Sequence, residues 1–155
     1  MPHTLDMIDR RILAALQRNG RISNVELANE VGLSPSPCLR RVKLLEDAGV
    51  IDRYVAVLNG AKIGLGLTVF VRVWFKTQDS TVTEKFAETV RQFPEVLECY
   101  LTTGECDALL RVVTEDLHAY WRFQSDRLAR IPSVQSVKTD VPMETIKRTN
   151  ELPLG

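Results

Sequence analysis

Residues 34–49 read SPSPCLRRVKLLEDAG and have the pattern of a short helix with well-marked ends. Ser34 is a residue type that favours the N-cap, and the proline after it occupies the first helical position, where a missing N–H costs nothing. Pro37 also falls in the first turn, before any intrahelical hydrogen bond is required. Gly49 can adopt the left-handed conformation that ends helices. The stretch therefore predicts a helix that stops at this glycine.

The predicted helix has one apolar face and one basic face. At 100° per residue, three apolar residues lie within about 60° of one another and form a buried seam: Cys38, Val42 and Leu45. The opposite side, about 140° or more from Cys38, carries a hydroxyl group and two cations: Ser36, Arg40 and Lys43. Such a face can enter the major groove of DNA, because cations neutralise phosphates and arginine pairs with guanine.

Two further helices precede this one in the sequence. The first is predicted from Asp6 to about residue 18 and ends at Asn19-Gly20, which tolerates a left-handed C-cap. The second begins at Ser23, has Glu26 at capping-box spacing and ends at Gly32. Two helices joined to a third by a very short turn form a helix-turn-helix. The candidate DNA-binding residues are Ser34, Ser36, Pro37, Arg40, Arg41 and Lys43.

Two alternatives to this interpretation stay open. A three-helix domain with a solvated charged face has the same pattern. Arg41 lies about 60° from the apolar seam, so it can pair with Asp9 or Glu46 instead of touching DNA.

Composition limits the other classes of function. The 155 residues have a net charge of zero, so the case for double-stranded DNA depends on where the charges lie. No signal peptide or membrane-spanning run is recognisable, which predicts a cytoplasmic protein that does not bind membranes. The three cysteines form no C-x-x-C pair and there are two histidines, so we expect no disulfide framework, no metal site and no catalytic triad.

The chain changes character near residue 60. Residues 50–58 alternate and are rich in β-formers, which predicts a strand that leaves the helical domain. Residues 59–66 hold three glycines and are typical of a linker. The sequence thus predicts a DNA-binding domain over residues 1–59 and a second domain over residues 60–155.

The second domain has the periodicity of a βαββαβ fold. Strands are predicted over residues 68–76, 96–102, 108–113 and 135–143, and helices over residues 83–93 and 117–130. This order is that of a ferredoxin-like sandwich, so the fold class is α+β. Two helices cover one sheet face only, and the other face, with Phe70 and Trp74, needs a partner. A second copy of the sheet is the natural one, although the chain's own termini are an alternative.

The chain resembles the Lrp/AsnC family of feast/famine regulators over nearly its whole length. The matching motifs are LDMIDRRIL at residues 5–13, SPSPCLRRV at 34–42, LEDAGVI at 45–51, the G-x-x-D turn at 104–107, METIK at 143–147 and LPL at 152–154. The resemblance implies a transcriptional regulator whose dimers assemble into octamers or similar rings. It also implies a small amino-acid effector bound between dimers, with no other cofactor.

The resemblance places the effector at the strand-turn-strand of residues 101–107. Free backbone amides around the turn glycine can hold a carboxylate, and an aspartate can take the amino group. The candidate residues are Leu101, Thr103, Gly104, Glu105, Cys106 and Asp107, with Thr139 and Val141 contributed by a neighbouring dimer. Alternatively, Gly104 is an ordinary hairpin glycine and Asp107 a turn former.

This turn departs from the commoner pattern of the family at Glu105-Cys106, where small, aromatic or apolar residues are frequent. Cysteine, or another sulfur-containing or polar amino acid, is therefore a candidate effector. Cys106 could also be a redox-sensitive thiol, although no activating cation is visible in the sequence.

Two other classes of function have to be weighed. Decarboxylases acting on modified tetrapyrroles share this architecture, but they need imidazole or cationic groups converging on a large pocket, and only His3 and His118 are available. An amino-acid-sensing module without DNA binding is the second, and the intact basic helix face argues against it. We therefore expect a regulator and not an enzyme.

Overall fold

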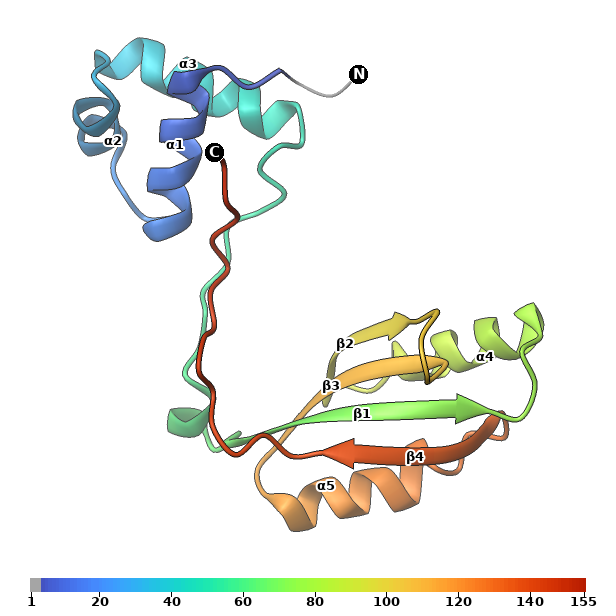
Figure 1. The fold of residues 1–155 in the computed structure, drawn as a ribbon. Helices are drawn as coiled ribbons and strands as arrows, with labels where there is room; N and C mark the ends of the chain where they lie inside the picture. The colour runs from blue at the N-terminus through green and yellow to red at the C-terminus, as the bar shows by residue number, and fades with distance from the viewer. Residues whose placement is uncertain (1–3) are drawn as a thin grey trace. The chain divides into compact units, whose positions relative to one another are not determined.

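The computed structural model describes residues 4–155, which divide into two compact units. The first unit holds the chain up to Val57 together with Lys147–Gly155, and the second holds Leu58–Ile146 (Figure 1). The boundary near residue 60 agrees with the division into domains expected from the sequence. The C-terminal segment does not, since it belongs to the helical unit instead of the second domain.

The first unit contains three helices, α1 (Met7–Arg18), α2 (Asn24–Val31) and α3 (Pro35–Asp47). Asp6 and Ser23 cap the first two through capping boxes, so local sequence specifies where these helices begin. Gly32 and Gly49 follow α2 and α3 in the left-handed conformation, with φ of 77° and 69°. The predicted left-handed C-cap of α1 is wrong, because Asn19 is extended, with φ of −144°.

A small apolar core holds these helices together. Its buried members come from all three helices: Ile12, Leu13, Ala15, Leu27, Ala28, Val31, Cys38 and Leu45. The predicted seam of α3 supplies two of them, Cys38 and Leu45, while Val42 packs at the edge. Burial raises the pKa of the Cys38 thiol, consistent with a structural role for this side chain.

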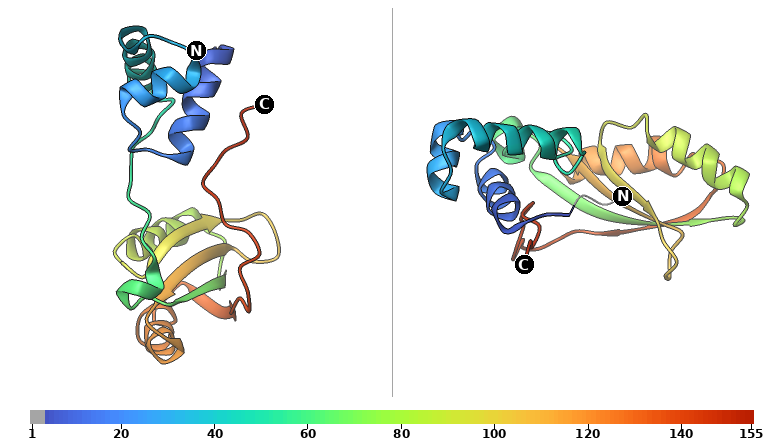
Figure 2. Two further views of the ribbon diagram at one scale, coloured as in Figure 1. Left: turned by 90° about the vertical axis from the view of Figure 1, so that its left-hand side faces the viewer. Right: turned by 90° about the horizontal axis from the view of Figure 1, so that it is seen from above.

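The second unit is the predicted ferredoxin-like sandwich. Its elements are η1 (Gly60–Ile63), β1 (Leu67–Phe75), α4 (Ser80–Val90), β2 (Val96–Leu101), β3 (Ala108–Thr114), α5 (Leu117–Phe123), the π-helix η2 (Gln124–Leu128) and β4 (Val134–Asp140). The strands form one antiparallel sheet in the order β2-β3-β1-β4. Helices α4 and α5 lie on the same side of this sheet (Figure 2).

Strand β1 shows why only one sheet face is covered. Val69, Val71 and Val73 are buried beneath the helices, whereas Phe70 and Trp74 point to the other face. Phe86 of α4 is fully buried in the same core. The alternation along β1 therefore confirms the predicted orientation of the strand.

Several predicted elements differ from the structure; among them, β4 ends at Asp140, three residues before its predicted end. Residues 50–58 form no strand, because their extended backbone has no ladder partner within residues 4–155. Helix α4 begins at Ser80, three residues before the predicted start, because Asp79 accepts a hydrogen bond from the Thr81 N–H. The second predicted helix changes into a π-helix at Gln124.

None of the helices within residues 4–155 combines the length and apolar character that crossing a membrane demands.

Candidate DNA interface and effector site

The polar face of α3 is open to solvent. Ser36, Arg40 and Lys43 are all exposed, as the helical rotation predicted. Arg40 and Lys43 form no ion pair with any residue in the described part of the chain. Their charges are therefore available to an external anion, and the helix that carries them follows α2 as the second helix of a helix-turn-helix.

The start of α3 is held by α2. Ser34 occupies the N-cap, but its hydroxyl makes no capping hydrogen bond and is exposed. The side-chain amide of Asn24 instead donates to the Pro35 carbonyl at 2.8 Å. Pro37 is half-buried in the first turn. The Ser34 hydroxyl is thus free for another partner, while the turn itself is fixed by Asn24.

Arg41 faces the protein instead of the solvent. Its guanidinium donates to the carboxylates of Asp6 at 2.7 Å and Asp9 at 2.9 Å. The pKa of the Asp6 carboxyl lies below its usual value, mainly because the Asp9 backbone N–H donates to it and additionally because of Arg41. The same two carboxylates raise the pKa of Arg41. Of the two roles left open for Arg41, the geometry matches the structural one, a tie between α1 and α3.

Leu39 of α3 is an exposed apolar residue that was not anticipated from the sequence. Leu39 is 57% exposed, although it lies next to the buried Cys38. It sits only about 40° around the helix from Lys43, four residues further on, so it belongs to the same solvent-facing surface. The sequence could have indicated this exposure, because Leu39 lies about 100° around the helix from the buried Cys38. An apolar side chain at this place can contact a thymine methyl group.

The turn between β2 and β3 is closed by backbone hydrogen bonds at its base. The Thr102 N–H donates to the Asp107 carbonyl, and the Asp107 N–H donates to the Val73 carbonyl, both at 3.0 Å. Within residues 4–155, the N–H groups of Thr103, Gly104 and Glu105 donate to no protein acceptor. The turn therefore presents a short run of free amide donors, as an anion site requires.

The Asp107 carboxylate anchors the turn to the end of β1. One oxygen accepts the Phe75 N–H at 2.7 Å, and the other accepts the Gln78 side-chain amide at 3.0 Å. Asp107 is consequently both a structural acceptor and a negative charge at the turn. Gln78 was not anticipated from the sequence, because its contact with Asp107 bridges 29 residues.

A cavity of about 350 Å³ lies beside this turn. It is lined by Phe75, Gln78, Thr83, Leu101, Thr102, Thr103, Gly104 and Asp107. Four of the predicted effector residues are therefore brought together, with polar groups on one side and Leu101 and Phe75 as apolar wall. A site of this size and composition suits a small amino acid.

Glu105 and Cys106 do not line this cavity. The Glu105 carbonyl accepts the Trp74 indole N–H at 2.8 Å, and its carboxylate lies 3.8 Å from Arg72. Cys106 is buried, with its sulfur 3.6 Å from the Thr102 hydroxyl. The two residues that depart from the family pattern thus face the outer sheet surface and the interior of the turn.

Thr139 and Val141 are not brought to the cavity within one chain. Thr139 lies on β4, at the sheet edge opposite β2, and its hydroxyl is hydrogen-bonded to that of Tyr120. Val141 follows the end of β4 and is exposed. Any contribution of these two residues to the cavity would therefore have to come from a second copy of the chain.

Known proteins resemble this chain over nearly its full length. A sequence model of the Lrp/AsnC ligand binding domain matches residues 68–152, and one of winged helix-turn-helix DNA-binding domains matches residues 5–52. The leucine-responsive regulatory protein of Escherichia coli K12 is 44% identical over 148 residues, covering 96% of this chain and 90% of that protein.

Solved structures give the same result. A transcriptional regulator from Neisseria meningitidis, in complex with L-methionine, is 46% identical with a TM-score of 0.94, covering 97% of both chains. An AsnC family transcriptional regulator from Agrobacterium tumefaciens is 41% identical with a TM-score of 0.91, again covering 97% of both chains. Together with its helix-turn-helix unit and its ferredoxin-like unit, these similarities show that the chain belongs to the Lrp/AsnC family of transcriptional regulators.

Proposed function

We propose that this protein regulates transcription in the cytoplasm by placing α3 in the major groove of its operator. The observation that carries the proposal is the exposed face of α3, where Arg40 and Lys43 have no protein partner within residues 4–155. At the start of the helix, the hydroxyl groups of Ser34 and Ser36 would donate to the phosphate backbone, and Pro37 would contact it without a hydrogen bond. Arg41 would contribute indirectly, because its ion pairs with Asp6 and Asp9 hold α3 against α1.

The effector that fits best is a small amino acid with an apolar side chain. The free amides of Thr103 and Gly104, which line the cavity, would hold its carboxylate, and Asp107 would take its ammonium group. Leu101 and Phe75 leave an apolar wall for the side chain. L-methionine and L-leucine are the first candidates, because one relative is solved with L-methionine and another is named for its response to leucine.

The uncovered sheet face supports assembly into a dimer. It combines aromatic side chains with internally paired charges: Phe70, Trp74 and Tyr100 lie beside the ion pairs Arg72–Asp140 and Arg111–Glu98. Aromatic residues and arginine are the types enriched at the centre of interfaces. A second copy of this face would bury it symmetrically and bring two α3 helices to one DNA duplex. The same sheet's β4 edge would then be free to offer Thr139 and Val141 to another dimer.

The dimer interface can be tested with Phe70→Glu. Burying an unpaired carboxylate costs several kcal/mol, so we expect the dissociation constant of the dimer to rise by about 100-fold or more. Leu117→Glu is the matched control, because Leu117 is an exposed apolar residue of α5 on the helix side of the sheet. Sedimentation velocity measures the oligomeric state of both variants and also separates dimers from octamers. A Phe70→Glu protein that stays dimeric would place the interface elsewhere.

The function itself is tested with a DNA fragment from the chain's own promoter. We expect retention in a gel shift that weakens steeply between about 50 and 200 mM salt, because phosphate contacts release counterions. A thermal-shift screen of the amino acids should single out L-methionine or L-leucine, since a ligand that binds the folded state raises the melting temperature. No retention at the lower salt concentration would contradict the regulator and favour a sensing module without DNA binding. Of the two histidines that the enzyme alternative would need, His118 stacks on the exposed Trp121 at a centroid distance of 6.0 Å, and His3 lies outside the described residues.

A further inference from the structure

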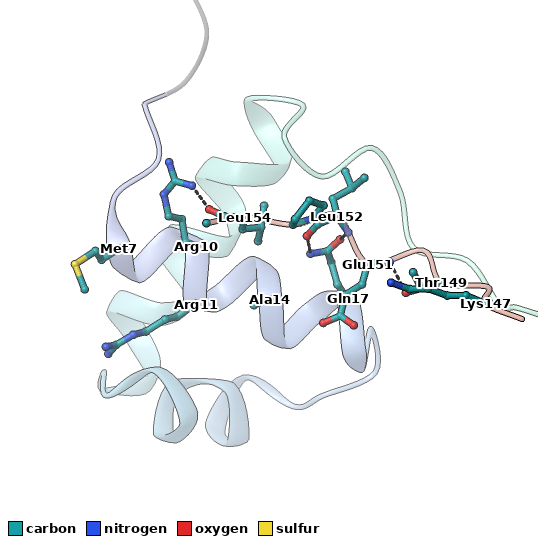
Figure 3. A pocket seen from close by; sticks show the side chains of 12 residues that line it. Met7, Arg10, Arg11, Ala14, Gln17, Lys147, Thr149, Glu151, Leu152 and Leu154 are labelled. Atoms are coloured by element: carbon teal, nitrogen blue, oxygen red, sulfur yellow. Dashed lines mark hydrogen bonds between the residues drawn. The ribbon is translucent and has the colours of Figure 1, made fainter.

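The last five residues of the chain are docked on α1 (Figure 3). The Gln17 side chain makes a pair of hydrogen bonds with Leu152: its amide donates to the Leu152 carbonyl at 3.1 Å, and its oxygen accepts the Leu152 N–H at 2.6 Å. The Arg10 guanidinium donates to the Leu154 carbonyl. This contact joins residues that are 135 or more positions apart in the sequence.

The docked segment is recognised mainly through its backbone. Leu152 is 71% exposed, so Gln17 binds its N–H and carbonyl without using the side chain. A glutamine amide that reads both groups acts as an adjacent β-strand would. Two residues later, the Leu154 side chain is half-buried and packs on the helical core. Backbone hydrogen bonds and one apolar anchor together hold the segment in place.

The surface that receives the segment is a built feature of α1. An open groove of about 660 Å³ lies between this face of α1 and the C-terminal segment, and its α1 side is lined by Met7, Arg10, Arg11, Ala14 and Gln17. Ala14 lies about 160° around the helix from the buried Ile12, so this face points away from the core, and its small side chain lets the backbone approach. No residue of α3 lines the groove. Docking therefore leaves the proposed DNA face unobstructed.

Because the C-terminal segment is docked on α1, two stretches of backbone tie the helical unit to the sheet unit. The first runs through residues 52–58, an extended stretch without any ladder partner in the described chain. The second runs from Asp140, the last residue of β4, to Leu152. Asp140 is itself paired with Arg72, which also lies 3.8 Å from Glu105 in the effector turn. A unit tied at two points explores fewer orientations than a unit tied at one.

We propose that the C-terminal segment is a strap whose docking on α1 restrains the helix-turn-helix for binding two half-sites at once. The inference rests on the proposed DNA-binding function of a dimer. When two binding modules are linked, the second engages at an effective concentration set by the linkage, so a looser tie weakens paired binding only. Undocking should reduce affinity for a fragment with two half-sites and leave a single half-site unaffected.

Leu152→Pro and Leu152→Ala test the strap as a matched pair. Proline removes the N–H that Gln17 accepts, whereas alanine keeps the backbone and removes only the exposed side chain. Gln17→Ala breaks the same contact from the helix side with a residue that favours helices, so folding of α1 is preserved. On a promoter fragment with two half-sites, mapped by footprinting, we expect about tenfold weaker binding for Leu152→Pro and Gln17→Ala. Leu152→Ala should bind as the wild type does.

The single half-site fragment separates the possible outcomes. Equal affinity of all four proteins for this fragment, with the tenfold loss confined to the paired fragment, supports the strap. Wild-type affinity of Leu152→Pro and Gln17→Ala for the paired fragment overturns it. An equal loss on both fragments also overturns it, because the segment would then serve the folding of the helical unit only. A wild-type protein that binds neither fragment refutes the proposed function itself, before any variant is compared.

Discussion

Arg40→Ala is expected to weaken binding to the promoter fragment by about 100-fold. A bidentate contact between arginine and guanine contributes roughly 1–3 kcal/mol, and a dimer would lose two of them. The guanidinium is exposed on α3 and has no ion pair within residues 4–155, so its removal leaves no protein group unsatisfied. The folded structure should therefore survive, and titration by fluorescence anisotropy should show the loss directly.

Two comparisons make the Arg40 result specific. Arg130→Ala removes the same charge from an exposed residue of the sheet unit and should leave DNA binding unchanged. Within residues 4–155, Arg130 pairs only with Asp126, at 3.8 Å. Arg40→Lys keeps the positive charge but loses the planar guanidinium that pairs with a base through two hydrogen bonds. If Arg40 contacts a base, this variant should therefore also bind DNA more weakly. Full affinity in Arg40→Lys with a loss in Arg40→Ala would assign Arg40 to a phosphate. Full affinity in Arg40→Ala would remove α3 from the interface.

Asp107→Asn is expected to abolish the response to the effector while the protein stays folded. In the wild-type structure the Phe75 N–H donates to the Asp107 carboxylate at 2.7 Å. The side-chain oxygen of asparagine can still accept this hydrogen bond, so the end of β1 stays anchored. The charge that would hold the ammonium group is lost, which should weaken L-methionine binding by about 30-fold or more, corresponding to roughly 2 kcal/mol or more. Isothermal titration and the thermal shift measure this loss independently.

Asp107→Ala and Glu105→Gln complete the comparison. Alanine leaves the Phe75 N–H without an acceptor, so this variant should lose both the effector response and about 1–3 kcal/mol of unfolding free energy. Glu105→Gln neutralises a carboxylate in the same turn that does not line the cavity, so the effector response should persist. If Asp107→Asn still binds L-methionine with full affinity, Asp107 is only a structural acceptor and the ammonium group has another partner.

Much of the fold could be predicted because its signals are local. Capping boxes at Asp6 and Ser23 are set by residues three apart, and they place the starts of α1 and α2. Alternation along β1 separates a buried from an exposed face within nine residues. The one predicted strand that failed, residues 50–58, has the right residue types but lacks a neighbour, and a strand exists only when paired.

The solvent-facing surface of α3 was likewise determined by the sequence alone, since a rotation of 100° per residue places Ser36, Arg40 and Lys43 together whatever surrounds the helix. The tertiary structure decided the rest, because each remaining feature depends on a partner distant in sequence. Arg41 turns to Asp6 and Asp9, Asp107 anchors the end of β1, and the C-terminal segment docks on Gln17. Periodicity carries no information about such pairs, because the backbone must first bring the two partners together.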